Sequence, residues 1–153
     1  MIKVRDTLTI GSIAGITATF SFLTVNYIFK LAGFQFTSTW EATASIFMSY
    51  NLIHTLLGYF VGFLGQYIIG ACGGVIMAYV LKYTGYDYYI LKGLGVGGFY
   101  WVSTVGIIGK LINLTTQFAN EPVTIFLIIL DLFIFSLISV LIITKYGDIL
   151  HKA

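Results

Sequence analysis

A small or polar residue recurs at every fourth position over one stretch of the chain, and the residues between are mostly large and apolar. Its members are His54, Gly58, Gly62, Gln66, Gly70, Gly74 and Ala78. Residues four apart lie on one side of an α-helix, so the repeat forms a flat seam along which another helix can lie very close. The 24 steps from residue 54 to residue 78 cover about 36 Å at about 1.5 Å each, enough to cross the apolar core of a bilayer. The stretch is therefore predicted to be a membrane helix.

The composition of the whole chain agrees with a membrane protein. Of its 153 residues, 58% are hydrophobic and only 9% are charged, whereas a soluble domain carries about 25% charge. Such a chain cannot cover a water-facing surface with polar side chains. The net charge of +2 is small and no Lys/Arg cluster occurs, so no nucleic-acid partner is expected. No soluble domain could hold a cofactor, and no enzyme activity is expected.

Four apolar segments are predicted to cross the bilayer as helices, at about 7–32, 52–82, 88–113 and 121–146. The predicted fold class is therefore all-α: a polytopic membrane protein forming a single membrane domain over 1–153. Asp6 and Asp87 are the expected N-caps of the first and third helices, and Gly33 is the expected residue after the first helix ends.

A further short helix is expected before the second span. Ser38-Thr39-Trp40-Glu41 matches the capping box, which predicts a helix start near Thr39. A helix running unbroken from there to Tyr83 would be too long for one crossing, so a bend or break is expected near 51–55. The first part would then be an interfacial helix that lies along the membrane surface or dips into it. The alternative is one long tilted helix that protrudes into water.

Small residues also line parts of the first and third segments. Gly11 and Gly15 form one close-packing pair, and Gly93 and Gly97 form another. The glycines near Gly93 could suggest a nucleotide-binding loop, but no strand precedes them and they lie inside an apolar segment. Seams on three helices exceed what one internal contact needs, so a homo-oligomer is predicted. Gln66, at mid-membrane on its seam, is expected to hydrogen-bond a neighbouring helix or its own copy in another subunit.

One carboxylate interrupts the last apolar segment. An ionised Asp131 at that depth costs about 2.5–3.5 kcal/mol on insertion scales, so the side chain must be protonated, paired or facing water. Asn26, His54 and Lys110 fall in the same half of the membrane on the other three segments, and we predict a polar cluster of these four residues. One hypothesis is a site for a proton or small ion; the other is a structural lock that holds helices together. No His, Cys, Asp and Glu spacing typical of a metal site is present.

The basic residues favour one orientation in the membrane. Four crossings put both termini on one side, and six basic residues fall there, against two on the other side. The six are Lys3, Arg5, Lys82, Lys92, Lys145 and Lys152; the two are Lys30 and Lys110. The positive-inside rule then predicts a multi-pass protein of the cell membrane with both termini in the cytoplasm.

Several short motifs along the chain resemble a known group. They are Arg5-Asp6 with Gly11-x-x-Ala14-Gly15 and Asn26, His54-Thr55 before Gly58, and Gly85-x-Asp87-Tyr88-Tyr89-x-Leu91-Lys92-Gly93. In these features the chain resembles small four-span bacterial integral membrane proteins of unknown function. The resemblance implies a four-span fold and no activity. The residue patterns of the fluoride channels and of the small multidrug transporters are not found.

Two functions follow from these patterns. The first is a structural or assembly membrane protein that works through glycine-rich self-association of its helices. The alternative is a small channel or proton-linked transporter that uses the polar cluster. In either case the lipid bilayer is the immediate partner.

The orientation can be tested by cysteine accessibility. In a Cys72→Ala background, a cysteine at position 2 or 153 should be protected from membrane-impermeant reagents in intact cells, because the basic residues hold both termini inside. Labelling of both positions from outside would contradict the assignment.

Overall fold

The described part of the chain is all helical. The computed structural model describes residues 4–108 and 122–149. The helices are α1 (Thr7–Leu31), α2 (Thr39–Phe47), α3 (Leu56–Thr84), α4 (Tyr89–Trp101) and α7 (Pro122–Tyr146). A short 3₁₀ turn, η1 (Tyr50–Leu52), precedes α3, and a π-helical stretch, η2 (Val102–Ile108), continues α4.

Three of these helices are long and apolar enough to cross a membrane. They are α1 with 25 residues, α3 with 29 and α7 with 25. Each coincides with a span predicted from the sequence, so the chain is a membrane protein. The third predicted span, 88–113, corresponds to α4 and η2, and its last residues lie outside the described ranges.

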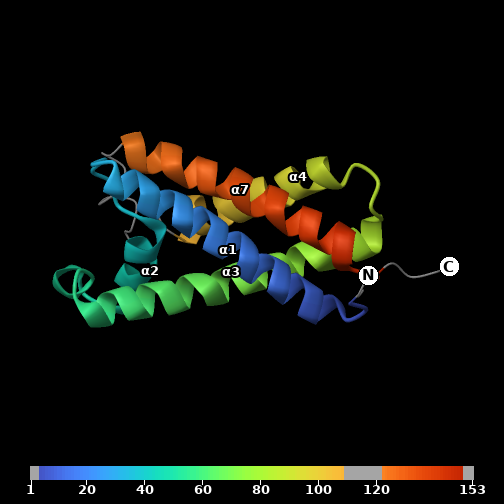
Figure 1. Ribbon diagram of the computed structural model, residues 1–153, viewed down its shortest axis with the longest axis horizontal. Coiled ribbons are helices and arrows are strands. Elements are labelled where there is room, and N and C mark those ends of the chain that lie inside the picture. Colours follow the sequence, from blue (N-terminus) through green and yellow to red (C-terminus); the bar gives the residue numbers. More distant parts are fainter. Residues whose placement is uncertain (1–3, 109–121, 150–153) are drawn as a thin grey trace.

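Both ends of the described chain lie at the same end of the helix bundle (Figure 1). The backbone N–H of Val4 donates to the Tyr146 carbonyl at 2.9 Å, and the N–H of Asp148 donates to the Val4 carbonyl at 2.9 Å. We call this the terminal end. The opposite end, where α2 lies between α1 and α3, is the α2 end (Figure 1).

Most of the helix boundaries expected from capping residues are confirmed. The Asp6 carboxylate accepts from the Thr9 N–H at 2.6 Å, and Gly33 follows α1 with a φ of +89°, a conformation that glycine adopts readily. The capping box is present and α2 begins at Thr39. The expected break before α3 is also present, since α2 ends at Phe47 and α3 begins at Leu56.

The expected cap of α4 is wrong. Tyr88, not Asp87, precedes the helix, and its φ of 53° places it in the left-handed region. The connection between α3 and α4 reverses the chain within the four residues 85–88. This tight turn places Tyr88, and not the Asp87 carboxylate, at the N-cap position. Lys92 instead stabilises the turn, because its ammonium donates to the carbonyls of Thr84 and Gly85 at 2.7 and 2.9 Å.

The backbones of α1 and α3 touch where their glycines meet. A Cβ added to Gly11 would lie 2.6 Å from the Cα of Val75, and one on Gly74 would lie 2.6 Å from the Gly15 nitrogen. A Cβ added to Gly70 would overlap the Thr19 hydroxyl oxygen of α1. Only residues without side chains permit this approach, because carbon atoms repel strongly at such distances.

The remaining predicted seam glycines also contact parts of the same chain. Gly58 lies against the backbone of Ile53, and Gly62 lies against the backbone of Trp40 in α2. On α4, Gly93 faces Val140 and Gly97 faces Ser136, both on α7. Because each seam has a partner within the chain, the seams do not by themselves indicate self-association, and the homo-oligomer stays a prediction.

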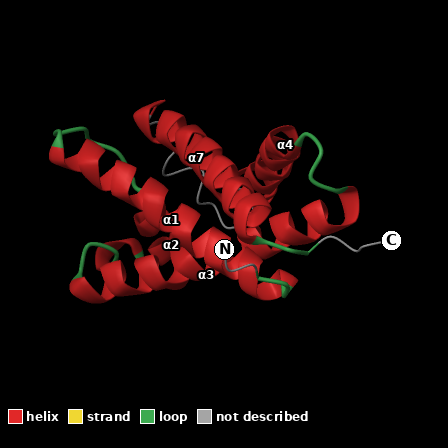
Figure 2. Ribbon diagram, turned by 45° about the vertical axis from the view of Figure 1, so that its right-hand side comes forward, coloured by secondary structure: helices red, strands yellow, loops and turns green. Residues whose placement is uncertain are grey.

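A different face of α4 is open. Cβ atoms added to Gly95 and Gly98 would meet no atom of the described residues within 4 Å. In the turned view α4 lies beside α7 (Figure 2).

Alanine substitutions should therefore have opposite effects at two glycines. Gly74→Ala should destabilise the protein, by about 1–3 kcal/mol, because the methyl group forces α1 and α3 apart. Gly95→Ala should be neutral or stabilising by up to about 1 kcal/mol, because alanine favours the helix and the space is open. Thermal unfolding in detergent measures both. Equal stability of the two variants would contradict the close contact.

Candidate functional site

Two polar side chains from distant parts of the sequence meet between α1 and α7. The Asn26 amide donates from Nδ2 to Oδ2 of Asp131 at 2.8 Å. Asn26 is 1% exposed and Asp131 is 5% exposed. A carboxylate and an amide so deeply buried in apolar helices are costly unless they pair, and this hydrogen bond joins the first long helix to the last.

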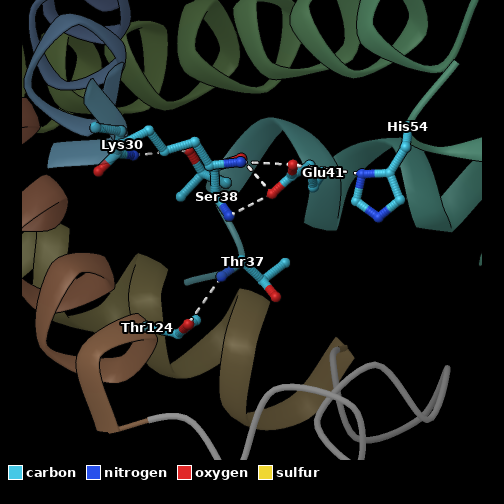
Figure 3. A network of polar contacts seen from close by, with 8 residues as sticks. Lys30, Thr37, Ser38, Glu41, His54 and Thr124 are labelled. Atoms are coloured by element: carbon cyan, nitrogen blue, oxygen red, sulfur yellow. Dashed lines mark hydrogen bonds and ion pairs between the residues drawn. The ribbon is translucent and has the colours of Figure 1, made fainter. Parts of the chain in front are cut away.

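Three ionisable side chains meet nearby, at the α2 end (Figure 3). The Lys30 ammonium lies 2.6 Å from Oε1 of Glu41, and Nδ1 of His54 lies 3.7 Å from the same oxygen. The Glu41 side chain is only 4% exposed, whereas that of His54 is 56% exposed. The group therefore extends from a buried carboxylate to an imidazole in contact with the surroundings.

The capping box fixes the position of Glu41. The backbone N–H and the hydroxyl of Ser38 both donate to Oε2 of Glu41, at 2.8 and 2.7 Å. The preceding segment is tied to α7, because the Thr37 N–H donates to Oγ1 of Thr124 at 3.0 Å (Figure 3). The first turn of α2 thus carries Glu41 into the bundle, with its other carboxylate oxygen facing Lys30.

Aromatic rings also lie close to the Lys30 ammonium. Its Nζ lies 4.9 Å from the ring centre of Trp40 and 5.7 Å from that of Phe36. Trp40 in turn stacks on Phe63 of α3, with 5.2 Å between ring centres. Cation–π attraction and the Glu41 carboxylate together stabilise the charge of Lys30 in its half-buried position.

A weaker contact connects the two groups. Nδ2 of Asn26 lies 3.4 Å from Oγ1 of Thr39, next to Ser38 in the chain. From here on, the name polar cluster means this observed set in place of the four residues predicted from the sequence. It consists of Asn26, Lys30, Ser38, Thr39, Glu41, His54 and Asp131.

The polar cluster contains oxygen atoms without a donor. Oδ1 of Asn26 and Oδ1 of Asp131 are buried, and neither has a hydrogen-bond partner in the described parts of the chain. Both are acceptors when the carboxyl group is ionised, so the pair lacks a proton donor or a cation. Ser136 and Ser139 of α7 also have buried oxygens without partners, but helical serines can turn to a carbonyl of their own helix.

The structure brings together only some of the four residues that the sequence predicts to form one cluster. Asn26 and Asp131 are in contact with each other, and His54 contacts Glu41. Lys110 lies outside the described residues. The sequence does not indicate Lys30 and Glu41 as members, because each already has an ordinary role, Lys30 as a basic residue at a helix end and Glu41 in the capping box. Gln66 hydrogen-bonds Thr43 of α2, which gives its amide a partner within the chain.

The chemistry available to the polar cluster is that of proton or ion binding. Within the described ranges, His, Cys, Asp and Glu form no group of three or more that could hold a metal ion. One carboxyl, one amide, one ion pair and one imidazole remain, and of these the carboxyl and the imidazole can each take up and release a proton.

The fold and the polar cluster define an α-helical membrane protein with a buried carboxyl group between its helices. No family model, curated protein or solved structure matches the chain. Its function is therefore inferred from its own geometry.

Replacing Asn26 tests whether the Asn26–Asp131 hydrogen bond stabilises the bundle. Asn26→Leu should lower the free energy of unfolding by about 1–3 kcal/mol, because Oδ2 of Asp131 is left buried without a partner. Replacing both residues by Leu should recover part of the loss, because no polar group then remains unpaired. Thr24→Val is the control on the same helix, since the exposed Thr24 hydroxyl bonds only a carbonyl of α1. If Asn26→Leu unfolds like this control, the hydrogen bond contributes nothing.

Proposed function

We propose that the protein is a four-span transporter or channel of the cell membrane, linked to protons through the polar cluster. In this proposal both termini are cytoplasmic, the protein is not an enzyme, and it needs no cofactor. The polar cluster then lies in the half of the bilayer away from the cytoplasm.

The fourth crossing consists of α4 and η2 together. They form 20 consecutive helical residues, 13 in α4 and 7 in η2, which cover up to about 30 Å. Along α4, Gly93 faces Val140 and Gly97 faces Ser136, so α4 runs antiparallel to α7. An even number of crossings also agrees with the pairing of Val4 and Asp148 at one end of the bundle.

In this arrangement α2 dips into the bilayer. It packs along the first half of α3, where Gly62 lies against the backbone of Trp40. A Cβ added to Gly65 would lie 2.7 Å from the Thr43 methyl group. A helix confined to the membrane surface would meet only the first turn of α3. Short helices that enter and leave on the same side are tolerated where protein surrounds them, and such helices often line ion sites.

The single observation that carries the proposal is the missing donor at Asn26 and Asp131. Nearly all buried polar atoms in proteins have hydrogen-bond partners, and an unsatisfied one inside a membrane costs several kcal/mol. A structural lock would be complete in itself. This pair is complete only when a proton or a cation is added, as expected of a site that loads and unloads.

The polar cluster also provides a connection toward water. His54 is the exposed member, and its imidazole faces the buried Glu41 carboxylate. Histidine changes charge near neutral pH, and it is therefore suited to take up and release protons at the entrance of such a path.

Flux through purified protein in liposomes tests the proposal. A pH gradient should drive proton movement, read by a pH-sensitive dye inside the vesicles, and Asp131→Asn should abolish it because an amide cannot exchange a proton. Asp87→Asn is the matched control, since this carboxylate is exposed at the terminal end. Flux that persists in Asp131→Asn, or that is absent from the unaltered protein, would overturn the proposal.

One observation favours a second candidate, the structural or assembly protein that self-associates. Gly95 and Gly98 leave a bare face on α4, and a second copy of the chain could approach its backbone there. The molar mass in detergent, measured by light scattering, distinguishes the two. A monomer without flux would exclude both functions.

A further inference from the structure

Two buried hydroxyl groups of α7 take no part in the polar cluster. Ser136 and Ser139 are both 0% exposed, and neither hydroxyl oxygen has a hydrogen-bond partner among the described residues. A serine inside a helix can bond a carbonyl of its own preceding turn, but neither hydroxyl does so in this conformation. Buried polar atoms without partners are rare in proteins, and polar side chains inside a membrane often line a path for water or ions.

Both serines lie between Asp131 and the terminal end of the bundle. They follow Asp131 by five residues (131 to 136) and by eight (131 to 139), or about 7.5 and 12 Å along the axis at about 1.5 Å per residue. Because α7 ends at Tyr146, Ser139 lies about halfway between the carboxyl group and the end of the helix. The polar side chains of α7 therefore continue beyond the polar cluster, toward the end of the bundle opposite α2.

The direction of these side chains changes steadily around α7. Asp131 faces Asn26 of α1, and the Ser136 oxygen faces α4, since a Cβ added to Gly97 would overlap it. At about 100° per residue, Ser139 points about 80° from Asp131 and about 60° from Ser136, and so falls between these two directions. The three residues therefore form one band along the buried side of α7, from its contact with α1 to its contact with α4. We call Asp131, Ser136 and Ser139 the polar band.

A layer of apolar side chains separates the polar band from the terminal end. Ile10 of α1, Leu81 of α3 and Ile143 of α7 belong to one buried cluster, and each is at most 1% exposed. Ile143 follows Ser139 by four residues (139 to 143), which is about one helical turn. The described side chains thus close the bundle on the terminal side of the two serines.

We propose, on the basis of the function proposed above, that Ser136 and Ser139 line the second half of the transport path. In this path water connects Asp131 to the terminal end when the apolar layer parts, and protons cross along it. Each serine hydroxyl can bond water in the open path and can turn to its own helix when the path is closed. The alternative is that the serines only pack, because small side chains let α4 approach α7 closely.

Cysteine labelling tests for water in the path without requiring transport. In a Cys72→Ala background, Ser139→Cys should react with a charged, membrane-impermeant methanethiosulfonate reagent, because the thiolate that reacts forms only in contact with water. The liposomes hold the protein in both orientations, so the reagent meets both ends of the bundle. Leu141→Cys is the matched control at nearly the same depth, since its side chain is 48% exposed on the outer surface of the bundle. Facing lipid, it should react about tenfold more slowly.

Removing both hydroxyl groups distinguishes a path from packing. The double variant Ser136→Ala and Ser139→Ala keeps small side chains and removes two unsatisfied polar groups, so its unfolding temperature should be unchanged or higher. Proton flux should nevertheless fall several-fold. Ser21→Ala is the control, because the exposed Ser21 hydroxyl bonds only a carbonyl of α1, and its flux should be unchanged.

The two experiments separate this proposal from the proposed function. Folded Ser139→Cys protein that reacts no faster than Leu141→Cys would overturn the path, as would a double alanine variant with unchanged flux or a lower unfolding temperature. Fast labelling of Ser139→Cys in a protein without flux would refute only the proposed function. Flux in the unaltered protein without this labelling would refute only the path along the serines.

Discussion

The contact between the backbones of α1 and α3 determines the rest of the arrangement. Gly11 and Gly15 meet Gly70 and Gly74 toward the terminal end, and from this crossing the two helices diverge (Figure 1). Helices that touch at one end and separate at the other leave a wedge of space between them. In this chain α2 fills the wedge, and its first turn carries Glu41 to Lys30. The glycine contact and the polar cluster are therefore two consequences of one crossing geometry.

The sequence was sufficient to predict the elements and insufficient to predict their partners. The apolar segments, the capping box at Ser38 and the break before Leu56 are local properties, and local propensity determines them. Which glycine faces which helix depends on rotation about the helix axis. A helix with glycines on two sides, as α4 has at Gly93 and Gly95, does not specify that rotation by pattern alone. The predicted seam of α3 likewise gave no sign that α2 and α1 would share it.

The candidate site shows the same limit. Asp131 and Asn26 could be identified from the sequence because a strongly polar residue inside an apolar segment is costly to bury and therefore indicates a polar partner or a function. Glu41 and Lys30 could not, since each already had an ordinary role at a helix end. Only the three-dimensional arrangement shows that the carboxylate that caps α2 also pairs with the last lysine of α1. Residues with two roles are easily missed when one role explains their type.

The hydrogen bond between Asn26 and Asp131 has a consequence for biosynthesis. The two residues are 105 positions apart, and chains are made at about 5–20 residues per second. Asn26 therefore enters the membrane about 5–20 s before its partner has been synthesised. During that interval its amide must bind water, another protein or the nearby Thr39 hydroxyl, which lies on the segment made next. The order of translation thus makes α2 the first support of a polar group that α7 completes.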